Sequence, residues 1–187
     1  MNRIKTATAV KIHSRRVEIE IFSTENNKLI VVGVLQDQRR FKSHLMTGET
    51  QPPGILHHMI IRMVVAGPGL LIEDIEVEMP QTPRTECREV EACLQPVIGM
   101  PISAGFTHRV KEAVSGPTGC SHLVGLLLAM APAAVQGYWS NVVRKPYNPA
   151  DYAGQAMGFV LDTCHVWRSD GPVVKEYRKK FGLPKQS

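Results

Sequence analysis

The sequence lacks the short motifs by which several enzyme classes are recognised. It contains no Gly-x-Ser-x-Gly nucleophile elbow, no glycine-rich phosphate-binding loop and no His-Glu-x-x-His zinc motif. No two of its four cysteines have the Cys-x-x-Cys spacing that makes a metal site easy to recognise. A reactive or metal-binding site must therefore be assembled from residues that lie far apart in the sequence.

We expect no segment that directs the chain to or through a membrane. The first 16 residues, MNRIKTATAVKIHSRR, contain no apolar stretch of the kind found in secretion signals. The longest apolar run, 123–135, is short for a bilayer span and rich in alanine and glycine. We therefore expect a cytoplasmic protein with no membrane partner. In that compartment its cysteines would be free or metal-bound, not paired in disulfides.

Charge of one sign is not concentrated anywhere in the chain. The net charge is +5 and the isoelectric point is about 9.1, but the basic residues are scattered in small groups. Such a chain can bind an anionic ligand, whereas a nucleic-acid reader gathers its positive charge on one face. We expect no nucleic-acid partner. The length of 187 residues predicts a single domain over 1–187, and a homo-oligomer stays open.

The pattern of apolar residues changes in the middle of the chain. Residues 8–80 read as strands, with alternation in VEIEIFS and two segment pairs that predict antiparallel hairpins, separated by the loop MTGETQPPG. Residues 83–182 read as helices. Strands followed by helices predict an α+β fold, in which an antiparallel sheet carries helices on one face.

Start and stop signals divide the helical half into segments. A Thr82-Pro83 start predicts a helix with periodic positions through Leu94. Ser103 can cap a second helix that ends at Gly116, and a long helix should run from about 121 to 139. Pro132 should kink or split that helix. The remaining expected elements are a helix begun by Asn148-Pro149, a turn at 169–171 and a short helix through Tyr177.

Cysteine and histidine occur together where the long helix begins, in the stretch GPTGCSHL. Cys120 lies where backbone N–H groups are unpaired and the helix dipole favours a thiolate, and His122 follows two residues later. Cys87 lies in the first turn of the first expected helix, which begins at Thr82-Pro83. His57 and His58 are neighbours on a strand, so at most one of them can face a given site. Whether Cys164 and His165 join such a site stays open.

Four stretches of the chain resemble, in order and spacing, an uncharacterised bacterial domain family. They are GILHHMIIRMVV, IEDIEVEMPQTPRTEC, VIGMPISAGFTHRVKEAV and GPTGCSHLVGLL. The family pattern comprises a His-x-Met strand, a Pro-x-x-Cys turn and a Gly-Cys-x-His-Leu motif. The resemblance covers about residues 10 to 170, and it implies no activity because the family is known by its sequence alone.

The order of elements is also distantly similar to iron–sulfur cluster scaffold and sulfur-acceptor proteins. By position, 56–58 corresponds to their Cys-Gly-Asp, Cys87 to their Gly-Cys and Cys120 to their last cysteine. This chain departs from them, because Leu56 replaces the first cysteine and Glu86 replaces the glycine before Cys87. The resemblance therefore implies a site for a metal, not an ordinary cluster scaffold.

Two hypotheses of different classes follow. The first is a metal-binding domain, for zinc or iron, whose ligands are His58 (or His57), Cys87, Cys120 and His122. An open coordination position would make it a metalloenzyme, and a filled set a structural or metal- and sulfur-handling site. The second is a metal-free thiol enzyme or small-molecule-binding protein. In that case Cys120 pairs with His122 or His108, and the candidate anion partners are Arg15, Arg62 and Arg109.

Overall fold

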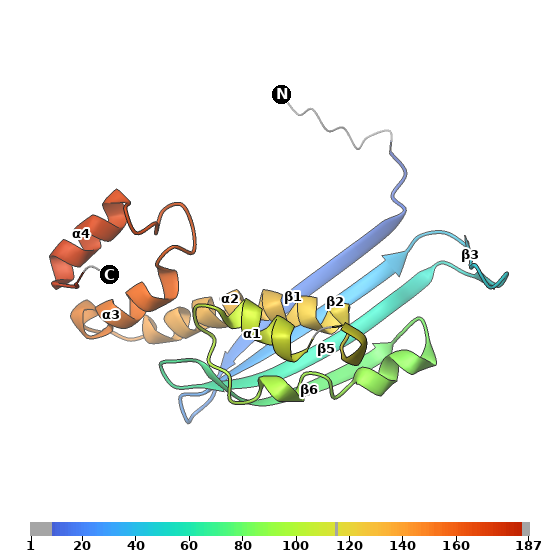
Figure 1. The fold of residues 1–187 in the computed structure, drawn as a ribbon, viewed down its shortest axis with the longest axis horizontal. Coiled ribbons are helices and arrows are strands. Elements are labelled where there is room, and N and C mark those ends of the chain that lie inside the picture. The colour runs from blue at the N-terminus through green and yellow to red at the C-terminus, as the bar shows by residue number, and fades with distance from the viewer. Residues whose placement is uncertain (1–8, 115, 185–187) are drawn as a thin grey trace.

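A four-stranded antiparallel sheet forms the base of the molecule. The computed structural model describes residues 9–114 and 116–184. The strands lie in the order β1-β2-β5-β6 (Figure 1). Their bounds are His13–Ser23 for β1, Leu29–Arg39 for β2, Gly54–Ala66 for β5 and Leu71–Gln81 for β6. The predicted α+β class is confirmed, because all four strands precede the helices.

Both predicted hairpins are present. Strands β1 and β2 are joined by a turn in which Asn27 has a φ of 56°, a conformation that asparagine tolerates better than most residues. Strands β5 and β6 are joined through Gly67, at a φ of 66°. The segment expected to be a loop between the hairpins contains a small two-stranded sheet of β3 (Ser43–His44) and β4 (Thr50–Gln51). It projects from the end of the main sheet (Figure 1).

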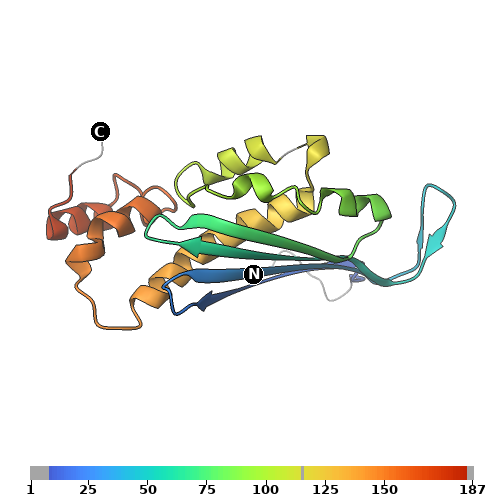
Figure 2. The same ribbon diagram turned by 90° about the horizontal axis from the view of Figure 1, so that it is seen from below.

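Helix α2 (Ser121–Val142) lies across one face of the sheet (Figures 1 and 2). Its buried side chains include Leu126 and Met130, which pack against the buried residues of β2 and β5. Two glycines allow the close approach: a Cβ on Gly33 would lie 2.5 Å from the Met130 sulfur, and one on Gly137 would lie 2.6 Å from Ile21 Cγ2. The absence of these two side chains lets α2 lie directly on β2 and β1.

By length and composition alone, α2 is long and apolar enough to cross a membrane. The sequence expectation of no membrane span rested on the apolar run 123–135, whereas the helix was expected over about 121–139 and extends to Val142. One side of it packs on the sheet, and about a third of its apolar stretch is buried there. Pro132 lies inside α2 and does not end it, since the helix continues to Val142. The residues around Pro132 stay packed against the sheet, which holds the helix in place despite the proline.

Two expectations for the segments before α2 were wrong. No α-helix begins at Thr82-Pro83; the described residues form two short 3-10 helices there, η1 (Thr85–Val90) and η2 (Gln95–Val97). Pro96 has no N–H to donate, which opposes an α-helix through this region. Ser103 does not cap α1 (Phe106–Ala113), because Gly105 takes the cap position at a φ of 79° and the Ser103 hydroxyl accepts a hydrogen bond from Arg109 instead.

The last two helices follow the sequence signals closely. Helix α3 (Pro149–Val160) is capped by Asn148, whose side-chain oxygen accepts a hydrogen bond from the Ala150 N–H at 3.2 Å. Helix α4 (Pro172–Phe181) is followed by Gly182 in the left-handed conformation. Both helices lie toward one end of the sheet, away from the β3–β4 hairpin (Figures 1 and 2).

Candidate functional site

A row of polar side chains crosses three neighbouring strands on the face that α2 covers. Strand register places Arg15 of β1 opposite Asp37 of β2, and Asp37 opposite His57 of β5. Residues opposite each other in an antiparallel pair project from the same face. On β2 this face otherwise carries the buried core residues Leu29, Val31 and Leu35. Asp37 therefore places a carboxylate at the end of a row of buried apolar side chains.

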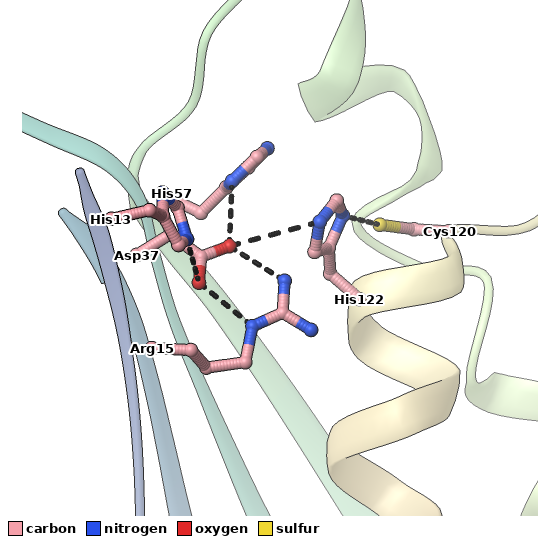
Figure 3. A network of polar contacts seen from close by, with 6 residues as sticks. All are labelled: His13, Arg15, Asp37, His57, Cys120 and His122. Atoms are coloured by element: carbon pink, nitrogen blue, oxygen red, sulfur yellow. Dashed lines mark hydrogen bonds and ion pairs between the residues drawn. The ribbon is translucent and has the colours of Figure 1, made fainter. Parts of the chain in front are cut away.

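Asp37 is the centre of this row. Its side chain is 2% exposed. Arg15 donates two hydrogen bonds to its carboxylate, from Nε to Oδ1 at 2.7 Å and from Nη2 to Oδ2 at 2.6 Å (Figure 3). His13 Nε2 lies 3.4 Å from Oδ1. The hydrogen bonds from Arg15 lower the pKa of Asp37 to about 2, against the opposing effect of burial. The carboxylate is therefore charged over the whole physiological range.

Two imidazoles approach the same carboxylate oxygen. His57 Nδ1 lies 3.1 Å from Asp37 Oδ2. His122, at the start of α2, points from the helix toward the sheet and places its Nε2 3.8 Å from Oδ2 (Figure 3). The two rings are 4.0 Å apart between centroids. Burial, with the nearby His57 and Arg15, lowers the pKa of His122, so this imidazole is neutral at pH 7 and keeps a free lone pair.

The three side chains lie close enough together that they could hold a metal ion. One ligand atom from each of Asp37, His57 and His122 lies within 4.8 Å of the others. Among the residues that the structure describes, no other set of three His, Cys, Asp or Glu side chains converges in this way. Two strands and a helix contribute the three groups, so the tertiary fold assembles the site.

Cys120 lies beside this group, on the far side of the His122 ring. Its Sγ is 3.9 Å from His122 Nδ1, whereas the other ring nitrogen faces Asp37 (Figure 3). The cysteine occupies the N-cap position of α2, as the sequence predicts, but it makes no side-chain cap hydrogen bond. The thiol therefore contacts the histidine and not the point on which the three ligand atoms converge.

The ligands predicted from the sequence are distributed over several places. His122 belongs to the converging group, and Cys120 contacts it. Of the two adjacent histidines that the sequence left open, His57 faces the group, because alternation along β5 directs His58 to the opposite face of the sheet. Cys87 packs against the core from η1 and is outside the converging group. Cys164 and His165 follow α3, where Cys164 is exposed and His165 contacts Arg168.

Sequence reasoning missed Asp37. A signal for it exists: in LIVVGVLQDQR every second residue is apolar or glycine up to Leu35, and the next position on that face is Asp37. A charged residue on the buried side of a strand needs a partner, which makes it a candidate for a site. Its partners on β1 and β5 depend on the strand register, which the sequence pattern leaves undetermined.

The three arginines proposed as anion partners have different roles. Arg15 holds Asp37, as described above. Arg62 forms an ion pair with Glu78 on the other face of the sheet. Arg109 donates hydrogen bonds to the carbonyl oxygens of Ala104 and Pro101, so it fixes the turn before α1. His108 pairs with Glu112 on the surface of α1, so the histidine that Cys120 contacts is His122.

Comparison with known proteins identifies a family but no activity. A family described as "Protein of unknown function (DUF2889)" matches residues 13–136, a range that contains every residue of the site. No curated protein and no solved structure matches the chain. The resemblance to an uncharacterised domain family is therefore supported, whereas the distant similarity to iron–sulfur cluster scaffolds receives no support.

Proposed function

The chain belongs to the family of unknown function DUF2889, and we propose that its site binds a divalent metal ion, zinc or iron, through Asp37, His57 and His122. The observation that carries this proposal is the convergence of their ligand atoms within 4.8 Å. Two imidazole nitrogens and one carboxylate oxygen are a ligand set that suits catalytic zinc and non-haem iron(II). Three protein ligands leave a coordination position for water or a substrate.

The surroundings of the three ligands support this assignment. Arg15 orients the Asp37 carboxylate and keeps it charged, while each carboxylate oxygen has more than one lone pair to offer. Because Arg15 already balances the charge of Asp37, a bound divalent ion would keep most of its positive charge. An anion in the open position, such as hydroxide or a substrate carboxylate, would balance that charge. The site would then activate water or polarise a carbonyl group.

The experiment that tests this proposal measures metal content and affinity. Protein purified without an affinity tag and supplied with zinc or iron should contain about one metal ion per chain. His57→Ala and His122→Ala should each weaken binding by at least about 100-fold, since a ligand is lost. His58→Ala is the matched control, because it removes an adjacent imidazole on the opposite face and should leave the affinity unchanged. A wild-type protein that binds neither metal would refute the proposal.

Cysteine variants separate this ligand set from the one that the sequence suggested. Because Cys120 contacts the outer nitrogen of His122, it orients the ring from outside the ligand set, and Cys120→Ala should weaken metal binding about 10-fold. Cys87→Ala should leave binding unchanged. Metal affinities measured by competition with a chelator give both numbers. If loss of Cys87 were as damaging as loss of His122, the ligand set would have to include that thiolate.

A second candidate function is thiol chemistry at Cys120. The observation that favours it is a relay: Cys120 Sγ lies 3.9 Å from His122 Nδ1, and His122 Nε2 lies 3.8 Å from Asp37 Oδ2. In this arrangement the imidazole can accept the thiol proton, and the Asp37 carboxylate stabilises the imidazolium that forms. None of the four cysteines forms a disulfide, so the Cys120 thiol is free to react.

Alkylation of the metal-free protein tests this second function. With iodoacetamide and mass-spectrometric readout, Cys120 should react faster than the exposed Cys164, which serves as an internal reference. His122→Ala should slow the reaction of Cys120 by about 10-fold and leave that of Cys164 unchanged. Equal rates at Cys120 with and without His122 would exclude a role for the relay.

A further inference from the structure

An open pocket lies between α1, α2 and α3, outside the polar site. Its volume is about 360 Å³, near the lower end of the range for small-molecule sites. Its wall is mostly apolar and includes Phe106, Leu128, Ala131, Pro132, Val135 and Phe159. None of the lining residues carries a charge; the polar side chains among them are Ser103, Thr107, Gln136 and Thr163. A pocket of this composition favours a neutral, largely apolar ligand.

Pro132 gives this wall a hydrogen-bond acceptor. Leu128, Ala131, Pro132 and Val135 have the spacing i, i+3, i+4 and i+7, so they share one face of α2, and all four line the pocket. In an α-helix the carbonyl oxygen of residue 128 accepts its bond from the N–H of residue 132, which proline does not have. The Leu128 carbonyl oxygen therefore loses its usual helical donor on the side of the helix that faces the pocket.

We infer that this pocket binds a small neutral ring compound that carries one hydrogen-bond donor, of the phenol class. The volume accommodates a single ring with short substituents, and the Phe106 and Phe159 side chains offer aromatic contacts. The donor of the ligand approaches from the pocket side and bonds to the Leu128 carbonyl oxygen, which Pro132 leaves without its helical partner. The pocket shares none of its lining residues with the Asp37 site, so this inference does not depend on metal binding.

Phenol and toluene are the probes, because they have similar shapes and only phenol has a donor. Calorimetric titration of the full chain should detect binding of phenol. Pro132→Ala restores the helical N–H, so the ratio of phenol affinity to toluene affinity should fall about five-fold, the amount expected for one hydrogen bond. The toluene affinity should change by less than two-fold, which shows that the pocket itself is intact.

A matched pair of glycine variants tests the location. A Cβ on either Gly158 or Gly154 of α3 meets nothing within 4 Å, but only Gly158 lines the pocket. Gly158→Leu should lower the affinity for both probes by at least 10-fold, and Gly154→Leu should leave it unchanged. The inference is overturned if neither probe binds at millimolar concentration. It is also overturned if Pro132→Ala preserves the ratio of affinities, or if Gly158→Leu binds as the wild type does.

Discussion

Replacing Asp37 by asparagine will lower the free energy of unfolding of the metal-free protein by about 2 kcal/mol at pH 7. The folded structure lowers the pKa of this buried carboxyl from 3.8 to about 2. That shift corresponds to about 2 kcal/mol of stability contributed by the charged form. Asparagine has a similar shape but no charge, so it loses the charge-assisted bonds from Arg15.

The difference between the two proteins will depend on pH in a defined window. A carboxyl whose pKa is lower in the folded state stabilises the fold above its unfolded pKa, and that contribution is lost as the pH falls through the folded pKa. For Asp37 the window runs from about pH 4 down to about pH 2. Below it, the protonated acid resembles asparagine, and the two stabilities should approach each other.

Urea unfolding of both proteins at pH 7, 5, 4, 3 and 2, in the presence of a chelator, measures this effect. Each stability is compared with that of the other protein at the same pH, so the titration of all other groups cancels. A stability difference that stayed constant from pH 7 to pH 2 would contradict the assigned state of Asp37. A wild-type protein that is no more stable than the variant at pH 7 would contradict the role of the Arg15 pair.

The α+β class and most element positions could be predicted because they depend on local patterns. Period-two alternation identified the strands, and Asn148-Pro149 identified the start of α3. The α-helix expected after Thr82-Pro83 is absent, because periodic apolar positions can also be satisfied by short 3-10 turns that pack on a core. Local signals did not distinguish these two outcomes.

The site was predicted less well because its geometry is non-local. The local signal at Cys120 and His122 was sufficient to locate the start of α2 in the site. The choice between His57 and His58 depended on which face of β5 meets the helix, which follows from the sheet order. Asp37 has no motif of its own, and it acquires its role from residues 22 positions before it and 20 after it.

The contact of α2 with the sheet is what brings His122 to the strand residues, and Gly137 is the glycine whose replacement will disturb it most. A Cβ at this position would lie 2.6 Å from Ile21 Cγ2 and 3.0 Å from Ile21 Cβ. Isoleucine is branched at Cβ and cannot rotate out of the way easily. At Gly33 the obstructing atoms belong to the flexible side chain of Met130, which can move.

Gly137→Ala will therefore lower the free energy of unfolding by about 2 kcal/mol, although alanine is the better helix former. Gly125→Ala is the matched control in the same helix, because a Cβ there meets nothing within 4 Å. It should raise the stability by up to about 1 kcal/mol. Urea unfolding monitored by circular dichroism gives both values. If both variants were more stable than the wild type, α2 would not lie against β1 as closely as this structure places it, and the geometry assigned to His122 would have to be revised with it.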